Sequence, residues 1–399
     1  MSGPGGAIPE RRRRPLLLLT ALAAGLLIFL VGREVGSRTG RPASLSDEVI
    51  DVVRSRYREP ISQRKLQRTA VDAVVASLKD PYTAYLDPSA LKRANDQGAG
   101  AYSGIGIRLD WTANHLVVAS VFPKSPAAIG GVLVGDELLA VDGRKVERLR
   151  DVAGSIVGKE GSIVRLRVST GRSAPREASL TRRRITAPAV ASTMKSVDGT
   201  PVGYVQLFGF TKGSGGQMRN AVNRLVDDGA KGLILDLRGD LGGFVSESVT
   251  AASSFLPKGA TIATTRGAHE KPETLKTKGG TVAAQLPLVV LVDQNSASAS
   301  EILSGALRDN GRATLVGTRT FGKARIQVTQ ELESGGALKV TIASYRTPSG
   351  FDLSDKGLPP AVFSVDNPRS DADEPLDVAL AVVTGRAPTR PPTAVPVVG

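Results

Sequence analysis

The sequence predicts an α/β protein built from more than one domain. In its second half, four apolar runs alternate with amphipathic stretches, which is the order of a mostly parallel sheet covered by helices. Short strands separated by glycines come before them, and a single long apolar run lies near the N-terminus. With 399 residues, 41% of them apolar, the chain is long enough for two or three hydrophobic cores.

Composition excludes several kinds of site. The chain has no cysteine, which rules out a thiol nucleophile, a thiolate metal site and a disulfide framework. Its two histidines, His115 and His269, lie in a predicted strand and a polar loop without metal-ligand spacing, so we expect no metal and no cofactor. Much of the +14 charge is local, in Arg11–Arg14 and Arg182–Arg184, and aromatic residues are scarce. We therefore expect no nucleic-acid partner.

The N-terminus predicts a membrane anchor. Residues 1–14 are basic, and residues 15–32 are an apolar run with Thr20 as its polar member. This run is near the lower limit for crossing a hydrocarbon core of about 30 Å at about 1.5 Å per helical residue. The arginines before it predict a cytoplasmic N-terminus and an extracytoplasmic remainder. A cleaved signal peptide is the alternative, but no small-x-small cleavage site follows the run.

We accordingly predict an uncleaved, single-pass signal anchor over 15–32 in the cell membrane, followed by a polar linker over 33–45. A small helical region is expected over 46–95, because apolar residues recur there at helical spacing. Two helices are predicted, and the second should stop before Asp80-Pro81, since proline disfavours a helical residue before it.

Residues 96–185 change to short strands separated by glycines. The string SPAAIGGVLVGDELLAVDG strongly resembles a PDZ domain. Upstream of this string, Gly104, Ile105, Gly106 and Ile107 resemble the loop whose backbone N–H groups receive the terminal carboxylate of a peptide. Glycine lets bare backbone turn tightly and approach an anion, and the peptide would add as a strand to the sheet edge.

Residues 186–385 are predicted to form the α/β core, and the proline-rich residues 386–399 a disordered tail. The predicted buried strands are Val202–Phe208, Gly232–Leu237, Leu286–Val292 and Ala313–Gly317. The predicted helices between them are Ser214–Val226, Val245–Phe255 and Ala299–Arg308.

Three alternating serines, Ser296, Ser298 and Ser300, follow the third of these strands. Ligands of α/β sheets gather at the carboxyl ends of strands. Ser298 would lie at the N-terminus of a helix, where unpaired N–H groups and the helix dipole favour a developing anion. An ordinary N-cap serine is the alternative.

A lysine 25 positions after Ser298 favours the nucleophile. The following strand returns the chain beside Ser298, with Lys323 at its carboxyl end. A lysine base must be neutral, and lowering its pKa from about 10.4 to about 7–8 takes roughly 4 kcal/mol, which burial beside Phe321 and Ile326 could supply. If residues 321–327 continue as a strand, Gln327 lies on the same face and its amide can orient the amine.

The segment DLRGDLGG, Asp236 to Gly243, ends another predicted strand. An oxyanion hole needs two preorganised donors, and the backbone N–H groups of Gly243 and Ala299 are the pair we select. An ordinary glycine turn is the alternative reading of this segment alone.

Together these features resemble the carboxyl-terminal processing (tail-specific) serine proteases. The resemblance rests on SASASEI, the lysine with a glutamine four positions later, DLR…GG, the preceding PDZ-like region and TPSG, and it covers roughly 46–383. It implies a crotonase-like core in which Ser298 is the nucleophile, Lys323 the general base and Gln327 its orienting group, with Gly243 and Ala299 as the oxyanion hole. Two positions depart from the family pattern: Asp240-Leu241 replaces an Asn-Pro pair, and Ala324 replaces a glycine.

The predicted function is therefore a membrane-anchored endopeptidase that recognises free C-terminal tails through its PDZ domain. Its partners would be protein or peptide substrates with free C-termini and the membrane, and the sequence leaves a regulatory partner or a homo-oligomer open. The alternatives are a membrane-tethered PDZ scaffold with an inactive hydrolase core, and a crotonase-like enzyme acting on a thioester.

Overall fold

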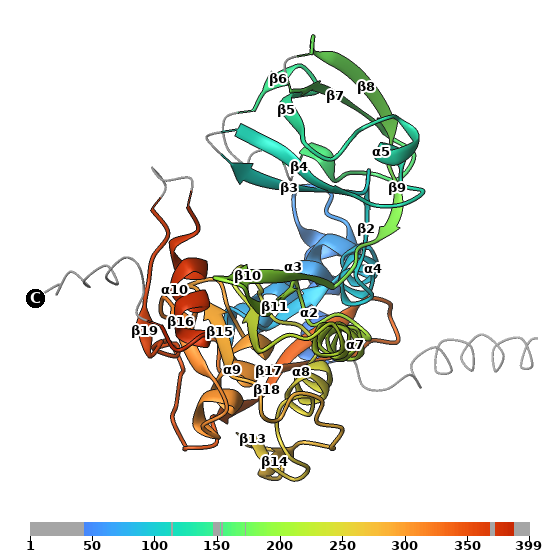
Figure 1. Cartoon of the computed structure of the whole chain (residues 1–399). Coiled ribbons are helices and arrows are strands. Elements are labelled where there is room, and N and C mark those ends of the chain that lie inside the picture. Colours follow the sequence, from blue (N-terminus) through green and yellow to red (C-terminus); the bar gives the residue numbers. More distant parts are fainter. Residues whose placement is uncertain are drawn as a thin grey trace, which may run out of the picture. The chain divides into compact units, whose positions relative to one another are not determined.

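The structure is a computed structural model that describes residues 44–112, 115–146, 152, 155–171, 173–367 and 372–386 (Figure 1). They fall into two compact units that divide between Lys79 and Asp80. The predicted basic N-terminus, the anchor over 15–32 and the proline-rich tail lie outside the described residues. No helix among the described residues is long and apolar enough to span a bilayer.

The first unit contains two helices, α2 (Leu45–Arg56) and α3 (Gln63–Ser77). A reciprocal capping box starts α2, because Ser44 and Asp47 each accept the other's backbone N–H. Ser62 caps α3 by accepting the N–H of Lys65. As predicted, α3 ends before Asp80-Pro81.

The second unit begins with β1 (Ala84–Leu86) and α4 (Pro88–Gly98). Strand β1 was not predicted from the sequence. Its three residues pair with β18 (Ala337–Arg346) far along the chain. A two-stranded ribbon of β2 (Ala101–Gly104) and β9 (Arg183–Thr186) follows and brackets the PDZ-like segment.

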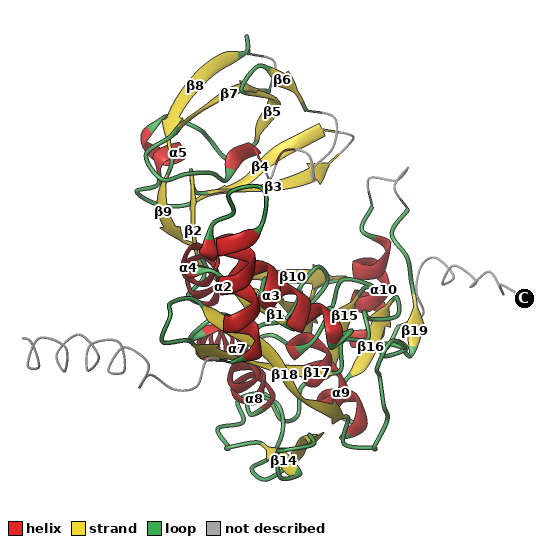
Figure 2. Ribbon diagram, turned by 180° about the vertical axis from the view of Figure 1, so that it is seen from behind, coloured by secondary structure: helices red, strands yellow, loops and turns green. Residues whose placement is uncertain are grey.

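The PDZ-like segment is an antiparallel sheet in the order β3-β4-β5-β7-β8, with the short β6 paired to β5 (Figure 2). Its elements are β3 (Ile107–Thr112), β4 (His115–Val121), α5 (Pro126–Ile129), β5 (Asp136–Val141), β6 (Arg144–Lys145), β7 (Ile163–Thr170) and β8 (Arg176–Thr181). Buried and exposed residues alternate along β7, which places Val164, Leu166 and Val168 in a separate apolar core.

The larger core has a six-stranded sheet in the order β10-β11-β12-β15-β16-β19. These strands are β10 (Val190–Val197), β11 (Thr200–Leu207), β12 (Gly232–Asp236), β15 (Leu288–Val292), β16 (Thr314–Gly317) and β19 (Val362–Phe363). From β11 onward the pairs are parallel, and every residue of β12 and β15 is buried. The structure therefore has the mostly parallel sheet that the continuous apolar runs predict.

Helices cover both faces of this sheet. Leu233 and Leu235 of β12 point into a core shared with α7 (Ser214–Asp227), α8 (Val245–Ala252) and α9 (Ala299–Asp309). Ile234, between them, packs on the other side with α10 (Glu374–Val383). A second sheet has the order β1-β18-β13-β14, with β17 also paired to β18. Its remaining strands are β13 (Thr261–Arg266), β14 (Glu273–Lys276) and β17 (Arg325–Glu331).

Candidate active site

Ser298 lies in a tight turn between β15 and α9, as the N-cap of that helix. Its backbone has φ 56° and ψ −112°, a conformation that residues with a Cβ rarely adopt and that costs about 1–3 kcal/mol. The side chain is 9% exposed, in contrast to its completely buried neighbours Ala299 and Ser300. Ser298 is thus slightly more accessible than the residues that follow it, at the start of a helix, where an anion is favoured.

The three alternating serines have different environments. Ser296 Oγ donates to the carbonyl of Leu237 (2.7 Å), and Ser300 Oγ donates to that of Asp240 (2.8 Å). These two hydroxyls bind residues 296–300, which we call the serine turn, to the loop after β12. Ser298 Oγ donates to no carbonyl or side chain in the part of the chain that the structure describes. Ser298 is therefore the serine whose hydroxyl is free for chemistry.

Glu301 connects the serine turn to the loop that carries Lys323. It is completely buried in the first turn of α9. Its carboxylate accepts four hydrogen bonds, from the N–H of Ser298 (2.9 Å), Thr320 Oγ1 (2.6 Å), and the N–H groups of Gly322 (2.7 Å) and Lys323 (2.8 Å). Burial raises the pKa of Glu301, and the four donors oppose that rise. One side chain thus holds two distant loops in register.

Lys323 lies in a loop, because β17 begins only at Arg325. The expectation that residues 321–327 form one strand is wrong in its first half. The positive φ of Gly322 (94°) turns the chain against the backbone of residues 355–357, where a Cβ would not fit. The side chain is half-buried, with Nζ 4.9 Å from the centre of the Tyr82 ring.

The pKa of Lys323 is lowered, first by burial and then by Lys339, while Glu301 and Asp80 oppose the shift. Sequence reasoning expected Phe321 to shield the amine. That side chain is 54% exposed, and the aromatic ring at Nζ belongs to Tyr82 instead. The direction of the shift increases the neutral fraction of the amine, which a base requires.

Gln327 lies on β17 immediately after a register shift, and its Nε2 donates to Thr341 Oγ1 (3.3 Å) on β18. Within the described residues, no hydrogen bond joins Ser298 Oγ to Lys323 Nζ, or Nζ to Gln327. The structure brings the backbones of Ser298 and Lys323 together through Glu301. The ends of the Ser298, Lys323 and Gln327 side chains are not hydrogen-bonded to one another in the described part of the chain. Catalytic hydrogen bonds are often long before substrate binds.

The loop after β12 approaches the serine turn closely. A Cβ on Gly242, which has φ 94°, would lie 2.9 Å from Ser298 Cβ and 2.8 Å from the nitrogen of Ala299. Gly243 is exposed, and its bridge to Phe210 uses the carbonyl of Gly242 and the N–H of Phe244. That bridge does not use the N–H of Gly243, and the residue before it, Gly242, lies against Ser298 and Ala299.

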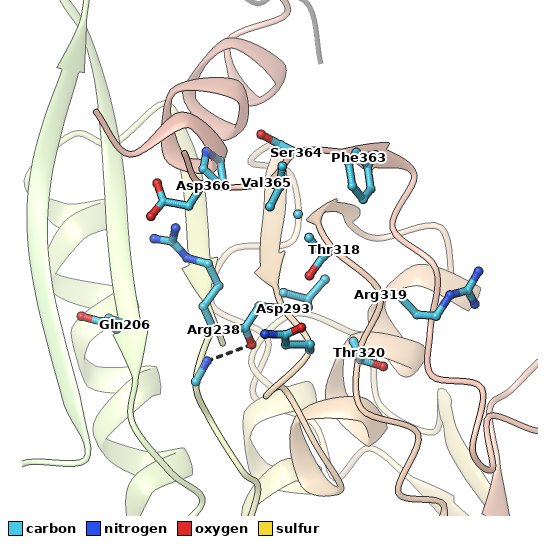
Figure 3. Close-up of a pocket in the computed structure, with 15 residues that line it drawn as sticks. Gln206, Arg238, Asp293, Thr318, Arg319, Thr320, Phe363, Ser364, Val365 and Asp366 are labelled. Carbon is cyan, nitrogen blue, oxygen red and sulfur yellow. Dashed lines mark hydrogen bonds between the residues drawn. The ribbon is translucent and has the colours of Figure 1, made fainter. Parts of the chain in front are cut away.

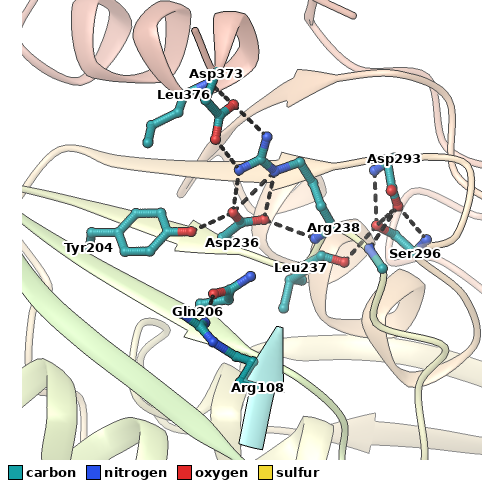
Figure 4. A network of polar contacts seen from close by, with 11 residues as sticks. Arg108, Tyr204, Gln206, Asp236, Leu237, Arg238, Asp293, Ser296, Asp373 and Leu376 are labelled. Carbon is teal, nitrogen blue, oxygen red and sulfur yellow. Dashed lines mark hydrogen bonds and ion pairs between the residues drawn. The ribbon is translucent and has the colours of Figure 1, made fainter. Parts of the chain in front are cut away.

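A partly buried ionic network fixes the start of this loop (Figure 4). Asp236, at the end of β12, binds Arg238 (2.6 Å) and accepts from the hydroxyl of Tyr204 (2.7 Å). Arg238 also pairs with Asp373 (2.7 Å), which caps α10. These partners hold the pKa of Arg238 above its usual value, although burial opposes them. The Asp and Arg of the DLR segment thus anchor the loop to β11 and α10.

A cavity of about 890 Å³ lies along the carboxyl edge of the parallel sheet (Figure 3). Its lining includes Arg238, Asp293, Thr320 and Phe363, from the ends of several strands. Asp293 accepts the N–H of Gly239 (3.0 Å), and Thr320 binds Glu301, so two residues of the cavity wall also support the loops around Ser298.

Comparison with known proteins identifies the family. Residues 201–363 match the model of peptidase family S41, and residues 117–169 match a PDZ domain. The chain is 35% identical to a carboxyl-terminal-processing protease of Synechocystis over 347 residues, which cover 84% of this chain and 81% of the relative. The chain belongs to the carboxyl-terminal processing peptidases of family S41.

Two further relatives support the same assignment. A carboxy-terminal-processing protease of Bartonella bacilliformis is 31% identical, over 84% of this chain and 77% of its own length. A solved photosystem II D1 C-terminal processing protease is 30% identical with a TM-score of 0.51, over 79% of this chain and 86% of its own. This S41 peptidase is therefore a serine-type peptidase that carries a PDZ domain.

Sequence reasoning missed three residues around this site. Glu301 could have been found, because serine followed three residues later by glutamate is the capping-box pattern at a helix start. Tyr82 had no local signal, since it is 241 positions from Lys323 in the chain. Asp240 was noticed only as a departure from the family pattern, although its carboxyl is completely buried.

Proposed function

We propose that this chain is a membrane-anchored, extracytoplasmic serine endopeptidase in which Ser298 is the nucleophile and Lys323 the general base. The observation that carries this proposal is the Glu301 carboxylate, which binds the N–H groups of both residues. A second support is the hydroxyl of Ser298, which is left without an acceptor while Ser296 and Ser300 bind the neighbouring loop.

In the proposed reaction, neutral Lys323 takes the proton of Ser298 Oγ while Oγ attacks the scissile carbonyl carbon. The oxyanion binds the N–H groups of Gly243 and Ala299. Collapse breaks the C–N bond, and the departing amine takes the proton from Nζ. A water molecule, deprotonated by the Lys323 amine, then attacks the acyl-enzyme. The ester bond to Oγ breaks, and Nζ returns the proton to Ser298 Oγ.

These reaction steps require Lys323 Nζ to move from the face of the Tyr82 ring toward Ser298 Oγ. Gln327, near the start of β17, would then orient the amine. Desolvation by the bound peptide would lower the pKa of Lys323 further, in the direction that its burial already favours.

Cleavage of an internally quenched peptide by serine variants tests the nucleophile. Ser298→Ala should lose at least about a thousandfold in kcat, the scale typical of a missing nucleophile. Ser296→Ala is the matched control. It removes a buried hydroxyl from the same turn and should lower stability while retaining measurable turnover. Turnover by Ser298→Ala above a tenth of the parent rate would refute the assignment.

We further propose that the PDZ domain binds the free carboxyl terminus of the substrate. In support, β3 is the terminal strand of its sheet in the described order, so its outer edge can accept an added strand. Gly104, Ile105, Gly106 and Ile107 lead into that edge, and Gly106 has φ 78°. A Cβ there would lie 2.3 Å from Ser125 Cβ, so the turn requires glycine.

Paired peptides with a free or an amidated C-terminus test this recognition. The parent should bind the free acid about 10- to 100-fold more tightly, which corresponds to about 1.5–3 kcal/mol for a hydrogen bond to a charged group. The Ser298→Ala variant permits the same measurement without cleavage. Equal affinity for both peptides would show that this domain does not recognise the chain end.

The anchor over 15–32 and the extracytoplasmic location remain part of the proposal. Membrane fractionation and external protease treatment of intact cells test them together. The full chain should stay with the membrane and be digested from outside. A soluble form that begins near Ser37 or Arg41 would indicate a cleaved signal peptide instead.

A further inference from the structure

A buried carboxyl group lies in the loop that contains the proposed oxyanion donor. Asp240 is completely buried, three residues before Gly243. Its Oδ1 accepts the N–H of Gly242 (2.8 Å), whereas its Oδ2 is buried without a hydrogen-bond partner. A carboxylate needs donors at both oxygens when it is removed from water. This group has one donor for its two oxygens.

The backbone around this carboxyl is in contact with the serine turn. The carbonyl of Asp240 accepts the N–H of Ala297 (3.0 Å) and the hydroxyl of Ser300 (2.8 Å), which flank Ser298. The hydrogen bond from Gly242 to the Asp240 side chain therefore orients backbone that touches the nucleophile on one side and continues into Gly243 on the other.

The charged groups on the surrounding elements are engaged elsewhere. Arg238 binds Asp236 and Asp373, and Asp293 accepts from Gly239. Glu301 accepts hydrogen bonds from the N–H groups of Ser298 and Lys323. Lys323 Nζ lies over the Tyr82 ring. Within the described residues, no cation pairs with the Asp240 carboxyl. Burial raises the pKa of Asp240 to about 7, and the hydrogen bond from the Gly242 N–H opposes that rise.

We propose that Asp240 is a positioning residue of the peptidase that acts in its protonated, uncharged form, and that loss of this proton lowers the rate of peptide cleavage. The neutral carboxyl accepts from Gly242 and keeps the loop against Ser298. An ionised carboxyl is an unpaired buried charge that favours displacement of the loop toward water. Its negative charge, in the same loop as the Gly243 N–H, also opposes formation of an oxyanion. The inference rests on the proposed role of Ser298.

The test is the pH dependence of kcat/KM for an internally quenched peptide, with the full chain in a mild detergent. The parent's activity should depend on two fractions: the neutral fraction of Lys323, which grows as the pH rises, and the protonated fraction of Asp240, which falls as the pH rises. Asp240→Asn should keep the acidic limb and lack the alkaline fall, so that its rate relative to the parent grows about tenfold per pH unit above the midpoint. The control Asp227→Asn removes an exposed carboxylate at the end of α7 and should follow the parent profile.

An Asp240→Asn variant that retains the parent's alkaline fall would overturn the proposal. So would an Asn variant that cannot fold, because the proposal holds that the folded enzyme already contains an uncharged side chain at this position. The Ser298→Ala result separates the two levels of the argument. If that variant stays active, the nucleophile assignment fails, whatever the profile of Asp240→Asn.

Discussion

Two buried carboxyl groups, those of Glu301 and Asp240, lie near Ser298, and they differ in the number of hydrogen bonds that they accept. Glu301 receives four hydrogen bonds, two to each oxygen, whereas Asp240 receives one from Gly242 and has one oxygen without a partner. Burial raises the pKa of both groups. The comparison shows that burial and hydrogen-bond donors act in opposite directions on the pKa of a carboxyl group, and that the fold supplies more donors to Glu301 than to Asp240.

The two groups also support different parts of the site. Glu301 binds the serine turn to the lysine loop, so its role is to bring nucleophile and base together. Asp240 lies in the loop of the proposed oxyanion donor, which Ser296 and Ser300 bind to the serine turn. The two carboxyl groups therefore support the two halves of one active site.

Replacing Glu301 should have the largest effect. Glu301→Gln keeps the shape, but its NH₂ group faces N–H donors and cannot accept from them. We expect stability to fall by about 3 kcal/mol, and kcat by about 10²-fold, since a misplacement of about 1 Å can cost that much. Enzyme kinetics and thermal unfolding measure the two losses.

Asp309→Asn is the matched control, because Asp309 is a buried carboxylate at the other end of α9 that accepts from Ser349 and Arg308. It should lose stability and keep kcat. A Glu301→Gln enzyme with the kcat of the parent would contradict the connecting role of Glu301.

Asp240→Asn should have an effect on stability that depends on pH. The unfolded carboxyl ionises near pH 4 and the folded one near pH 7. Since the folded pKa is raised, the contribution of protonated Asp240 to the stability of the parent is fully present below about pH 4. It is lost as the pH rises to about 7. The loss in the free energy of unfolding is roughly 4 kcal/mol, because each unit of pKa difference corresponds to about 1.4 kcal/mol. The stability of Asp240→Asn relative to the parent should therefore increase over this range, as chemical unfolding at pH 4.5 and pH 8 would measure. A constant difference would mean that Asp240 is ionised in the fold.

Tyr82 should have the smallest effect. Its ring favours the charged form of Lys323, an interaction of about 0.5–1 kcal/mol. Tyr82→Leu keeps an apolar neighbour but removes the ring, so the acidic limb of the pH–rate profile should move to lower pH by about half a unit. Tyr82→Phe retains the ring face and should leave the limb in place. A shift in both variants would assign the effect to the hydroxyl.

Local patterns predicted the parallel strands of the core and the place of Ser298 at the start of a helix. The continuous apolar runs predicted the parallel strands, and the alternating serines before an amphipathic helix predicted the position of Ser298. Each of these depends on neighbours in the chain. The strand expected over residues 321–327 was wrong in its first half, because Glu301 and the backbone of residues 355–357 hold Gly322 and Lys323 in a loop.

The parts that could not be predicted depend on contacts across the chain. Tyr82 contacts Lys323 from a segment near the start of the second unit. The pattern of apolar residues in the sequence does not predict such a contact. The sequence shows that Asp240 is an aspartate, but not that one of its oxygens has no donor. Charge state at this site is a property of three-dimensional packing, and only the assembled loops determine it.

The central claim is that neutral Lys323 serves as the base for Ser298, and the kinetics of Lys323→Arg test it most directly. Arginine keeps the length, the positive charge and the contact with Tyr82, but its guanidinium does not lose a proton in proteins. Lys323→Arg should be as inactive as Lys323→Ala, with kcat/KM at least about a thousandfold below the parent. A Lys323→Arg enzyme within tenfold of the parent would show that the positive charge of residue 323, and not its ability to accept a proton, supports cleavage.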